Sequence, residues 1–185
     1  VFAEDDAESS LPFQLMGDCQ RFNKKTILAA VRLLQQKMPI SSQAIADGLA
    51  HVVELTGLKG RWQKLGDSPL IIADTGHNEA GIRLIVNQLS RLTYKTLRMV
   101  MGVVNDKDVN AMLSLLPKDA IYYFTNAAIP RALPASELQE LAKNYDLIGK
   151  NYPSVQEALL AAKNEASNDD VIFVGGSNFI VAEVV

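Results

Sequence analysis

Short apolar runs alternate with amphipathic segments along the last two thirds of the chain. The apolar runs predict strands at residues 70–74, 96–102, 120–125, 146–149 and 170–175, with a strand-like piece at 60–66 before them. The amphipathic segments predict helices at 78–91, 107–116, 135–143 and 154–166, and a short last helix after Ser177. Continuously apolar strands are typical of sheets that helices cover on both faces. The pattern therefore predicts a three-layer, doubly wound α/β fold with a mostly parallel sheet.

The first 56 residues have a different pattern. The alternating Leu11, Phe13 and Leu15 predict a short strand that ends at Gly17. A helix follows from Asn23 to Pro39, and a second one, capped by Ser41 or Ser42, runs to about residue 57. The residues expected to face inward from these helices are Ile27, Leu28, Val31, Leu34, Ile45, Leu49 and Val52. We interpret this portion as helices without a sheet of their own to cover.

Composition and charge exclude several classes of protein. The chain has 185 residues, 48% hydrophobic and 21% charged, so it can form a full core. A net charge of −3 gives no sign of a nucleic-acid or membrane surface, and no apolar run is long enough to cross a membrane. The single cysteine, Cys19, excludes an internal disulfide and fits a reducing compartment. The start lacks a Met and a signal peptide, so we expect a cytoplasmic protein and an excised fragment.

Candidate chemistry is concentrated where the strands end. Strand 70–74 ends in Asp74, and His77 follows in the turn before the next helix. Such a turn suits phosphate or carboxylate, although Asp74 could simply cap the helix and His77 could be a surface residue. Polar residues and glycines also follow the other strands, as Gly102 to Asp108, Thr125-Asn126 and Gly175 to Asn178. Because parallel strands end at one edge of a sheet, these groups should converge there.

Other candidates have a structural and a functional interpretation. Arg61, in Gly60-Arg61-Trp62, is either a surface arginine stacked on Trp62 or a phosphate-binding group at a domain junction. Ser177 follows two glycines and either caps the last helix or cradles a carboxylate. Asp108 is expected to cap a helix, whereas Lys107 could meet an acidic ligand.

Several chemistries are poorly supported. The chain has no Gly-Lys-Ser or Gly-Lys-Thr phosphate loop and no Gly-x-Gly-x-x-Gly after a strand. His51 and His77 are the only histidines, and no spacing supports a zinc site. A triad of Ser177, His77 and Asp74 could be assembled on paper, but no Gly-x-Ser-x-Gly elbow is present.

Six motifs in one order carry a family resemblance. They are Gly17-Asp18-Cys19-Gln20-Arg21-Phe22-Asn23, Gly60-Arg61-Trp62, Asp74-Thr75-Gly76-His77-Asn78, Met101 to Asp108, Pro130-Arg131-Ala132-Leu133 and Gly175-Gly176-Ser177. Their order and spacing resemble the folylpolyglutamate synthase/dihydrofolate synthase family, a branch of the Mur ligases. The resemblance implies that residues 57–185 are the carboxyl-terminal Rossmann-like glutamate ligase domain. It implies that residues 1–56 are the end of the central ATPase domain.

The resemblance also implies the reaction. ATP would activate a carboxylate of a reduced folate or dihydropteroate to an acyl phosphate, which the amino group of L-glutamate attacks to form an amide. The phosphate loop and the Mg²⁺ ligands would lie in the missing amino-terminal ATPase domain, so no metal ligand is expected here. The fragment would be inactive alone.

Site roles follow from the same resemblance. Asn23, Arg61 and Asp74 match nucleotide-binding positions, and His77 and Ser177 match positions near the incoming glutamate. The sequence departs from the family at Cys19, usually a histidine, and at Thr75-Gly76, usually Gly-Ala.

Two alternatives stay open at this point. One is a peptidoglycan Mur ligase domain, against which the Asp106-Lys107-Asp108 and Pro130 to Leu133 motifs weigh. The other is a nucleotide- or glutamate-binding α/β module without ligase chemistry. The sequence does not separate dihydrofolate synthase from folylpolyglutamate synthase activity.

Overall fold

The computed structural model describes residues 10–105 and 108–185. The chain divides into two compact units, Val1–Arg61 and Trp62–Val185, which we call unit 1 and unit 2. The domain boundary predicted from the sequence, after residue 56, lies a few residues before this division.

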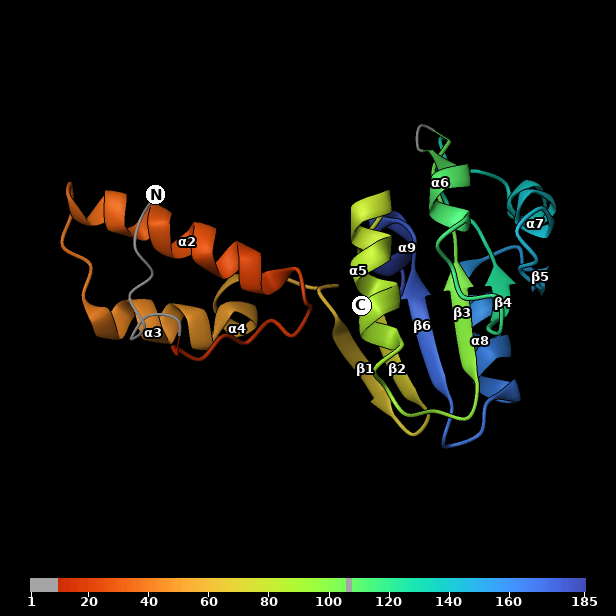
Figure 1. The fold of residues 1–185 in the computed structure, drawn as a ribbon, viewed down its shortest axis with the longest axis horizontal. Helices are drawn as coiled ribbons and strands as arrows, with labels where there is room; N and C mark the ends of the chain where they lie inside the picture. The colour runs from red at the N-terminus through yellow and green to blue at the C-terminus, as the bar shows by residue number, and fades with distance from the viewer. Residues whose placement is uncertain (1–9, 106–107) are drawn as a thin grey trace. The chain divides into compact units, whose positions relative to one another are not determined.

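Unit 1 is helical in its described part (Figure 1). Its helices are α2 (Gln20–Gln35), α3 (Ser42–Ala50) and α4 (Val52–Thr56). The Ser41 side chain caps α3 by accepting a hydrogen bond from the Ala44 N–H at 3.1 Å, which confirms one of the two predicted caps. The second predicted helix is interrupted at His51, whose backbone leaves the helical region (φ −126°, ψ 35°).

The predicted strand at Leu11–Gly17 is wrong. Instead of joining a sheet, this segment bonds to the backbone on either side of the helix interruption at His51. The Gln14 N–H donates to the Leu49 carbonyl at 3.1 Å, and the Gln14 side chain accepts from the Val53 N–H at 2.6 Å. Gln14 therefore bonds main-chain groups on both sides of the interruption. Leu11, Phe13 and Leu15 are half-buried, and within the described residues the segment pairs with no strand.

The predicted inward face of the first helix is only partly correct. Leu28 is buried, whereas Ile27 and Leu34 are exposed. Further large apolar side chains of unit 1 are exposed, namely Met16, Phe22, Leu33, Met38, Val53, Leu55 and Leu58. Unit 1 thus lacks enough described structure to cover its own apolar surface.

Unit 2 contains the sheet. Its strands and helices are β1 (Gln63–Asp67), β2 (Leu70–Asp74), α5 (Glu79–Leu89), β3 (Leu97–Met101), α6 (Val109–Leu113), β4 (Ile121–Phe124), α7 (Ala135–Lys143), β5 (Gly149–Asn151), α8 (Val155–Glu165), β6 (Val171–Gly175) and α9 (Asn178–Ala182). The described residues form a six-stranded sheet in the order β1-β2-β6-β3-β4-β5, antiparallel at β1 and parallel elsewhere. The predicted mostly parallel α/β sheet is confirmed.

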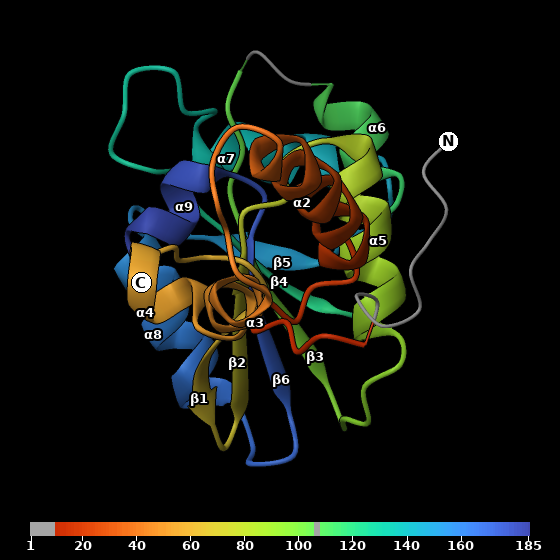
Figure 2. The ribbon, with the colours of Figure 1, turned by 90° about the vertical axis from the view of Figure 1, so that its left-hand side faces the viewer.

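Helices cover both faces of this sheet, and Figure 2 shows α5 and α8 on opposite sides of it. On one face, side chains of α5, α6 and α7 pack with Ile72, Met99 and Phe173. On the other face, α8 and α9 pack with Ile71, Val100 and Ile172. Adjacent residues of one strand thus enter different cores, because side chains alternate across a strand. This explains why the central strands are apolar at most positions, Arg98 of β3 and Asp74 at the end of β2 being the exceptions.

Except for β2, the strand bounds differ from the prediction by one to three residues, and β5 is displaced most. The strand expected at 146–149 begins at Gly149, because hydrogen-bonded turns after the end of α7 occupy residues 144–147. Asp146 takes the left-handed conformation (φ 60°), and the Leu147 N–H donates to the Ala142 carbonyl at 3.2 Å. This bond closes the helix end, so the chain can join β4 only two residues later.

The amino end of the sheet holds a buried charged network. Arg98 of β3 donates to Asp170, just before β6, at 2.9 Å and to the Tyr123 hydroxyl of β4 at 2.6 Å. The Tyr123 hydroxyl donates to Glu165 at 2.5 Å, and Arg98 also donates to the Glu165 carbonyl at 2.7 Å. Arg98 and Asp170 are only 8% and 3% exposed. The network therefore ties three strands and the end of α8 together.

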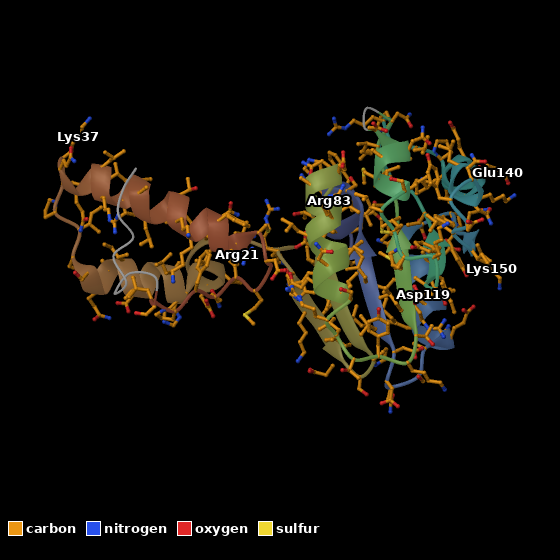
Figure 3. All side chains as sticks on the ribbon, in the orientation of Figure 1. Arg21, Lys37, Arg83, Asp119, Glu140 and Lys150 are labelled. Carbon is orange, nitrogen blue, oxygen red and sulfur yellow. The ribbon has the colours of Figure 1, made fainter. Side chains whose placement is uncertain are left out.

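Apart from this network and the buried Asp74, the described charged residues of unit 2 lie at its periphery. Figure 3 shows Arg83 on α5, Glu140 on α7 and Lys150 on β5 at its outer surface. Arg83 pairs with Glu79 of the same helix at 2.8 Å, and both side chains are more than half exposed. No helix among residues 10–105 and 108–185 is long and apolar enough to cross a membrane.

Candidate functional site

The carboxyl ends of four strands lie at one level of the sheet. In the strand register, Asp74 of β2 is opposite Gly175 of β6, and Gly175 is opposite Met101 of β3. Met101 is in turn opposite Phe124 of β4. The arrowheads of β3, β4 and β6 point to this edge in Figure 1. The predicted convergence of the strand ends is confirmed, and it brings Asp74, His77 and Ser177 to the same edge.

Asp74 is held by main-chain amides. Its Oδ1 accepts from the Gly76 N–H at 2.8 Å, and its Oδ2 accepts from the Trp62 N–H at 2.7 Å. The carboxylate is 6% exposed. The alternative that Asp74 caps the following helix is wrong. Asn78 caps α5 by accepting from the Gly81 N–H at 2.8 Å.

His77 is anchored within the same turn. Its Nδ1 lies 3.0 Å from the Thr75 carbonyl oxygen. Because a carbonyl can only accept, Nδ1 carries the proton in this contact. The imidazole is then either neutral, with a lone pair on Nε2, or a cation that donates from both nitrogens. The side chain is half-buried.

Ser177 caps α9. Its Oγ accepts from the Phe179 N–H at 3.2 Å, and the residue is 2% exposed. Gly176 directly before it has φ 93°, and an added Cβ would lie 2.7 Å from the Gly102 carbonyl oxygen. Only glycine fits this approach between the ends of β6 and β3. The capping interpretation of Ser177 is therefore confirmed, and its hydroxyl proton is still able to donate to another group.

The two remaining predicted residues belong to unit 1. Asn23 lies in the first turns of α2, and its Nδ2 donates to the Gln20 side chain at 2.9 Å. Arg61 is exposed and is the last residue of unit 1. Trp62 is half-buried against the core of unit 2, with its ring centroid 6.4 Å from that of Phe173.

The loops after β3 and β4 lie side by side. Val104 and Ala132 form an isolated bridge, and the Asn105 N–H donates to the Arg131 carbonyl at 3.0 Å. The predicted cap at Asp108 is confirmed, since its side chain accepts from the Ala111 N–H at 3.0 Å. The Lys107 hypothesis lies outside the described residues.

Sequence reasoning did not single out the side chain of Thr125. It follows β4 at the same edge, is fully buried, and its hydroxyl has no hydrogen-bond partner in the described part of the chain. Its position after an apolar strand was visible in the sequence, but its lack of a partner depends on packing between strands. Within the described residues, no three His, Cys, Asp or Glu side chains are grouped so that they could hold a metal ion.

The family follows from a comparison with known domains. Residues 60–178 match the model of the Mur ligase glutamate ligase domain. The chain belongs to the Mur ligase family. The match covers nearly all of unit 2, including the carboxyl edge of its sheet.

Relatives within this family agree with the motif order. The chain is 30% identical to the folylpolyglutamate synthase of Lacticaseibacillus casei over 93% of its length, which is 39% of that protein. It is 32% identical to the dihydrofolate synthase/folylpolyglutamate synthase of Escherichia coli over 88% of its length, or 37% of that protein. The chain thus spans about two fifths of the length of these relatives.

Solved structures extend the likeness to three dimensions. Escherichia coli FolC in complex with DHPP and ADP superposes with a TM-score of 0.78 at 29% identity, covering 94% of this chain and 39% of that one. A bifunctional folylpolyglutamate synthase/dihydrofolate synthase with Mn, AMPPNP and L-glutamate bound gives a TM-score of 0.74 at 31% identity. That match covers 88% of this chain and 38% of the other. The predicted fold of a Mur ligase carboxyl-terminal domain is confirmed.

Proposed function

We propose that this chain is part of an ATP-dependent folate–glutamate ligase. The observation that carries the proposal is the likeness to folylpolyglutamate and dihydrofolate synthases over most of the chain, helices of unit 1 included. Two of the similar structures hold ADP with DHPP, and AMPPNP with L-glutamate. The substrates of this protein would accordingly be ATP, L-glutamate and a reduced folate or dihydropteroate.

The reaction divides between two groups of residues. ATP converts the folate or pteroate carboxylate to an acyl phosphate, and the glutamate nitrogen then displaces phosphate to form the amide. Asn23 and Arg61 are assigned to the nucleotide itself, and Asp74 to the nucleotide side of the site. Arg61 suits the phosphates because a guanidinium can bind two oxygens at once and remains charged at all relevant pH values.

His77 and Ser177 are assigned to the glutamate. His77 follows the β2 end and Ser177 the β6 end, and these strands are adjacent. A serine hydroxyl that caps a helix still has its proton to donate to a carboxylate, and a protonated Nε2 of His77 could do the same. Burial of Ser177 supports this role in one respect, since hydrogen bonds to a charged ligand are stronger away from water.

The remaining chemistry is assigned to other parts of a longer protein. The chain has no Gly-Lys-Ser or Gly-Lys-Thr loop. Its described residues do not provide a cluster that fits Mg²⁺. The exposed apolar side chains of unit 1 support its proposed origin in a larger ATPase domain, whose core would cover them.

The test is an ATP-coupled assay of the full-length protein. It should turn over ATP only when L-glutamate and either dihydropteroate or tetrahydrofolate are present. The Arg61→Ala variant should lower kcat/KM for ATP about a hundredfold, as loss of one group that stabilises transition-state charge does. Arg83→Ala, which removes an exposed arginine on α5, is the matched control and should keep full activity.

Two outcomes would reject the proposal. Turnover with a UDP-muramyl substrate instead of a folate would move the protein to the peptidoglycan branch of the family. ATP or glutamate binding without any turnover of folate substrates would leave a binding module. If Arg61→Ala left kcat/KM for ATP unchanged, only the proposed role of Arg61 would be rejected.

A further inference from the structure

The buried Asp74 carboxylate accepts hydrogen bonds from two main-chain amides, one of them at the start of unit 2. One oxygen of Asp74 accepts from Gly76, two residues ahead, and the other accepts from Trp62, twelve residues before it. The bond to Gly76 closes the turn after β2. The bond to Trp62 joins the end of β2 to the first residue of unit 2. Hydrogen bonds to a charged acceptor are about twice as strong as neutral ones, and burial prevents water from replacing them.

Trp62 needs such a bond. The ladder between β1 and β2 ends at the pair Gln63 and Ala73, one residue short of Trp62 and Asp74. Trp62 has φ 49°, a left-handed conformation that costs a bulky side chain free energy. Its N–H therefore cannot continue the ladder in a regular way, and the Asp74 carboxylate accepts it instead. Packing of the indole near Phe173 holds the other side of the residue.

The N–H that Asp74 accepts belongs to the peptide group formed by Arg61. We infer that Asp74 is a positioning residue that fixes the Arg61–Trp62 peptide at the carboxyl end of β2. It thereby fixes the peptide group that carries the Arg61 carbonyl. The inference rests on the proposed function in one respect, the use of Arg61 at the ATP phosphates. The contact between Asp74 and the peptide group can be tested without any activity.

The first test is amide hydrogen exchange of the 185-residue chain. In the wild-type chain the Trp62 amide should be protected from exchange at least tenfold more strongly than the amide of the exposed Lys59, although both precede the first strand. Asp74→Asn should abolish this difference, because an amide side chain has one acceptor oxygen for two N–H groups. Asp67→Asn, an exposed carboxylate of β1, is the matched control and should change nothing.

Tryptophan fluorescence provides a second test of the same contact. Trp62 is the single tryptophan of the chain, so all indole emission reports on this residue. Asp74→Asn should shift the emission to the red and increase quenching by acrylamide, with Asp67→Asn again unchanged. The wild-type exchange measurement needs no variant, so the inference is decided even if Asp74→Asn does not fold. An unprotected Trp62 amide in the wild-type chain would overturn it.

The functional consequence is tested by a double-mutant cycle in the full-length enzyme. If Asp74 acts through Arg61, Asp74→Asn should lower kcat/KM for ATP about tenfold alone and less than twofold in the Arg61→Ala background, since residues that act as a unit are not additive. A direct nucleotide contact would give the same loss in both backgrounds, and that additive result would overturn the positioning role. If the wild-type enzyme showed no ligase activity, the proposed function would be rejected. Hydrogen exchange of the Trp62 amide would still show whether Asp74 bonds the Arg61–Trp62 peptide.

Discussion

The two ends of the same sheet place buried polar groups in different ways. At the amino end, the charged side chains of Arg98, Asp170 and Glu165 satisfy one another around the Tyr123 hydroxyl. At the carboxyl end, Asp74 is bonded to main-chain amides, and the buried Thr125 hydroxyl has no partner in the described part of the chain. The first arrangement is closed on itself. The second keeps polar capacity for other groups.

The difference separates stability from function. A buried ion pair that loses one partner leaves an uncompensated charge, so the amino end should tolerate little change. At the carboxyl end Asp74, His77 and Ser177 are fixed by turns and a cap, and the Thr125 hydroxyl has no partner in the described part of the chain. We expect mutations at the amino end to affect folding, and mutations at the carboxyl end to affect the site more than the fold.

The largest effect is expected from Arg98→Ala. It leaves Asp170 buried without its cation and should lower the free energy of unfolding by about 3–5 kcal/mol. Urea denaturation of the 185-residue chain measures this. The control is Arg83→Ala, whose exposed pair with Glu79 should contribute about 0.3–0.5 kcal/mol. Equal losses in the two variants would contradict the proposed role of the network.

A smaller loss is expected from Gly176→Ala at the carboxyl end. The left-handed backbone and the close Gly102 carbonyl should cost about 1–3 kcal/mol. Gly48→Ala is the control, since it lies in α3 with nothing within 4 Å of an added Cβ. That change should stabilise α3 by up to about 1 kcal/mol. An unchanged melting temperature in Gly176→Ala would show that the strand ends can separate.

The amino end should also respond to acid. Burial raises the pKa of the Asp170 carboxyl, but hydrogen bonds from Arg98 and Ser167 outweigh burial and hold that pKa below its ordinary value. A carboxyl with a lowered pKa stabilises the fold above its unfolded pKa of about 4, and this contribution is lost as the pH falls through the folded pKa.

We therefore expect unfolding free energy to fall below about pH 4 more steeply in the wild type than in Asp170→Asn. Urea titrations at several pH values measure the slope. The exposed Asp146, whose pKa is lowered by hydrogen bonding to Lys118, contributes in the same range. An Asp146→Asn control separates the two carboxylates. Parallel pH curves for wild type and Asp170→Asn would exclude Asp170 as the source.

The smallest effect is expected from Thr125→Val. Its buried hydroxyl bonds no described residue, so its removal should change the free energy of unfolding by less than about 1 kcal/mol, or raise it. Tyr123→Phe is the matched hydroxyl deletion at the other end of the sheet. It loses hydrogen bonds to Arg98 and Glu165 and should cost about 1–3 kcal/mol. A larger loss from Thr125→Val than from Tyr123→Phe would reverse the comparison between the two ends.

Local patterns predicted the part of the fold that local forces decide. Strand 70–74 was placed with its observed bounds, and the cap at Asp108 follows from its own side chain. The strand expected at Leu11–Gly17 failed because Gln14 bonds Leu49 and Val53, which are far along the chain. A pattern of apolar residues cannot distinguish such a partner from a neighbouring strand.

The sequence by itself determined the alternation of strands and helices, because each depends on the period of apolar residues. It also placed polar groups after the strands that meet at the carboxyl edge. Only the tertiary structure decided what those groups bond. Asn78 and not Asp74 caps α5, and Asp74 reaches back to Trp62. Arg98 lies in an apolar strand because Asp170 and Glu165 meet it there. The bonds of Asp74 to Trp62 and of Arg98 to Asp170 and Glu165 join residues distant in the chain, and only the packed sheet brings them within hydrogen-bond distance.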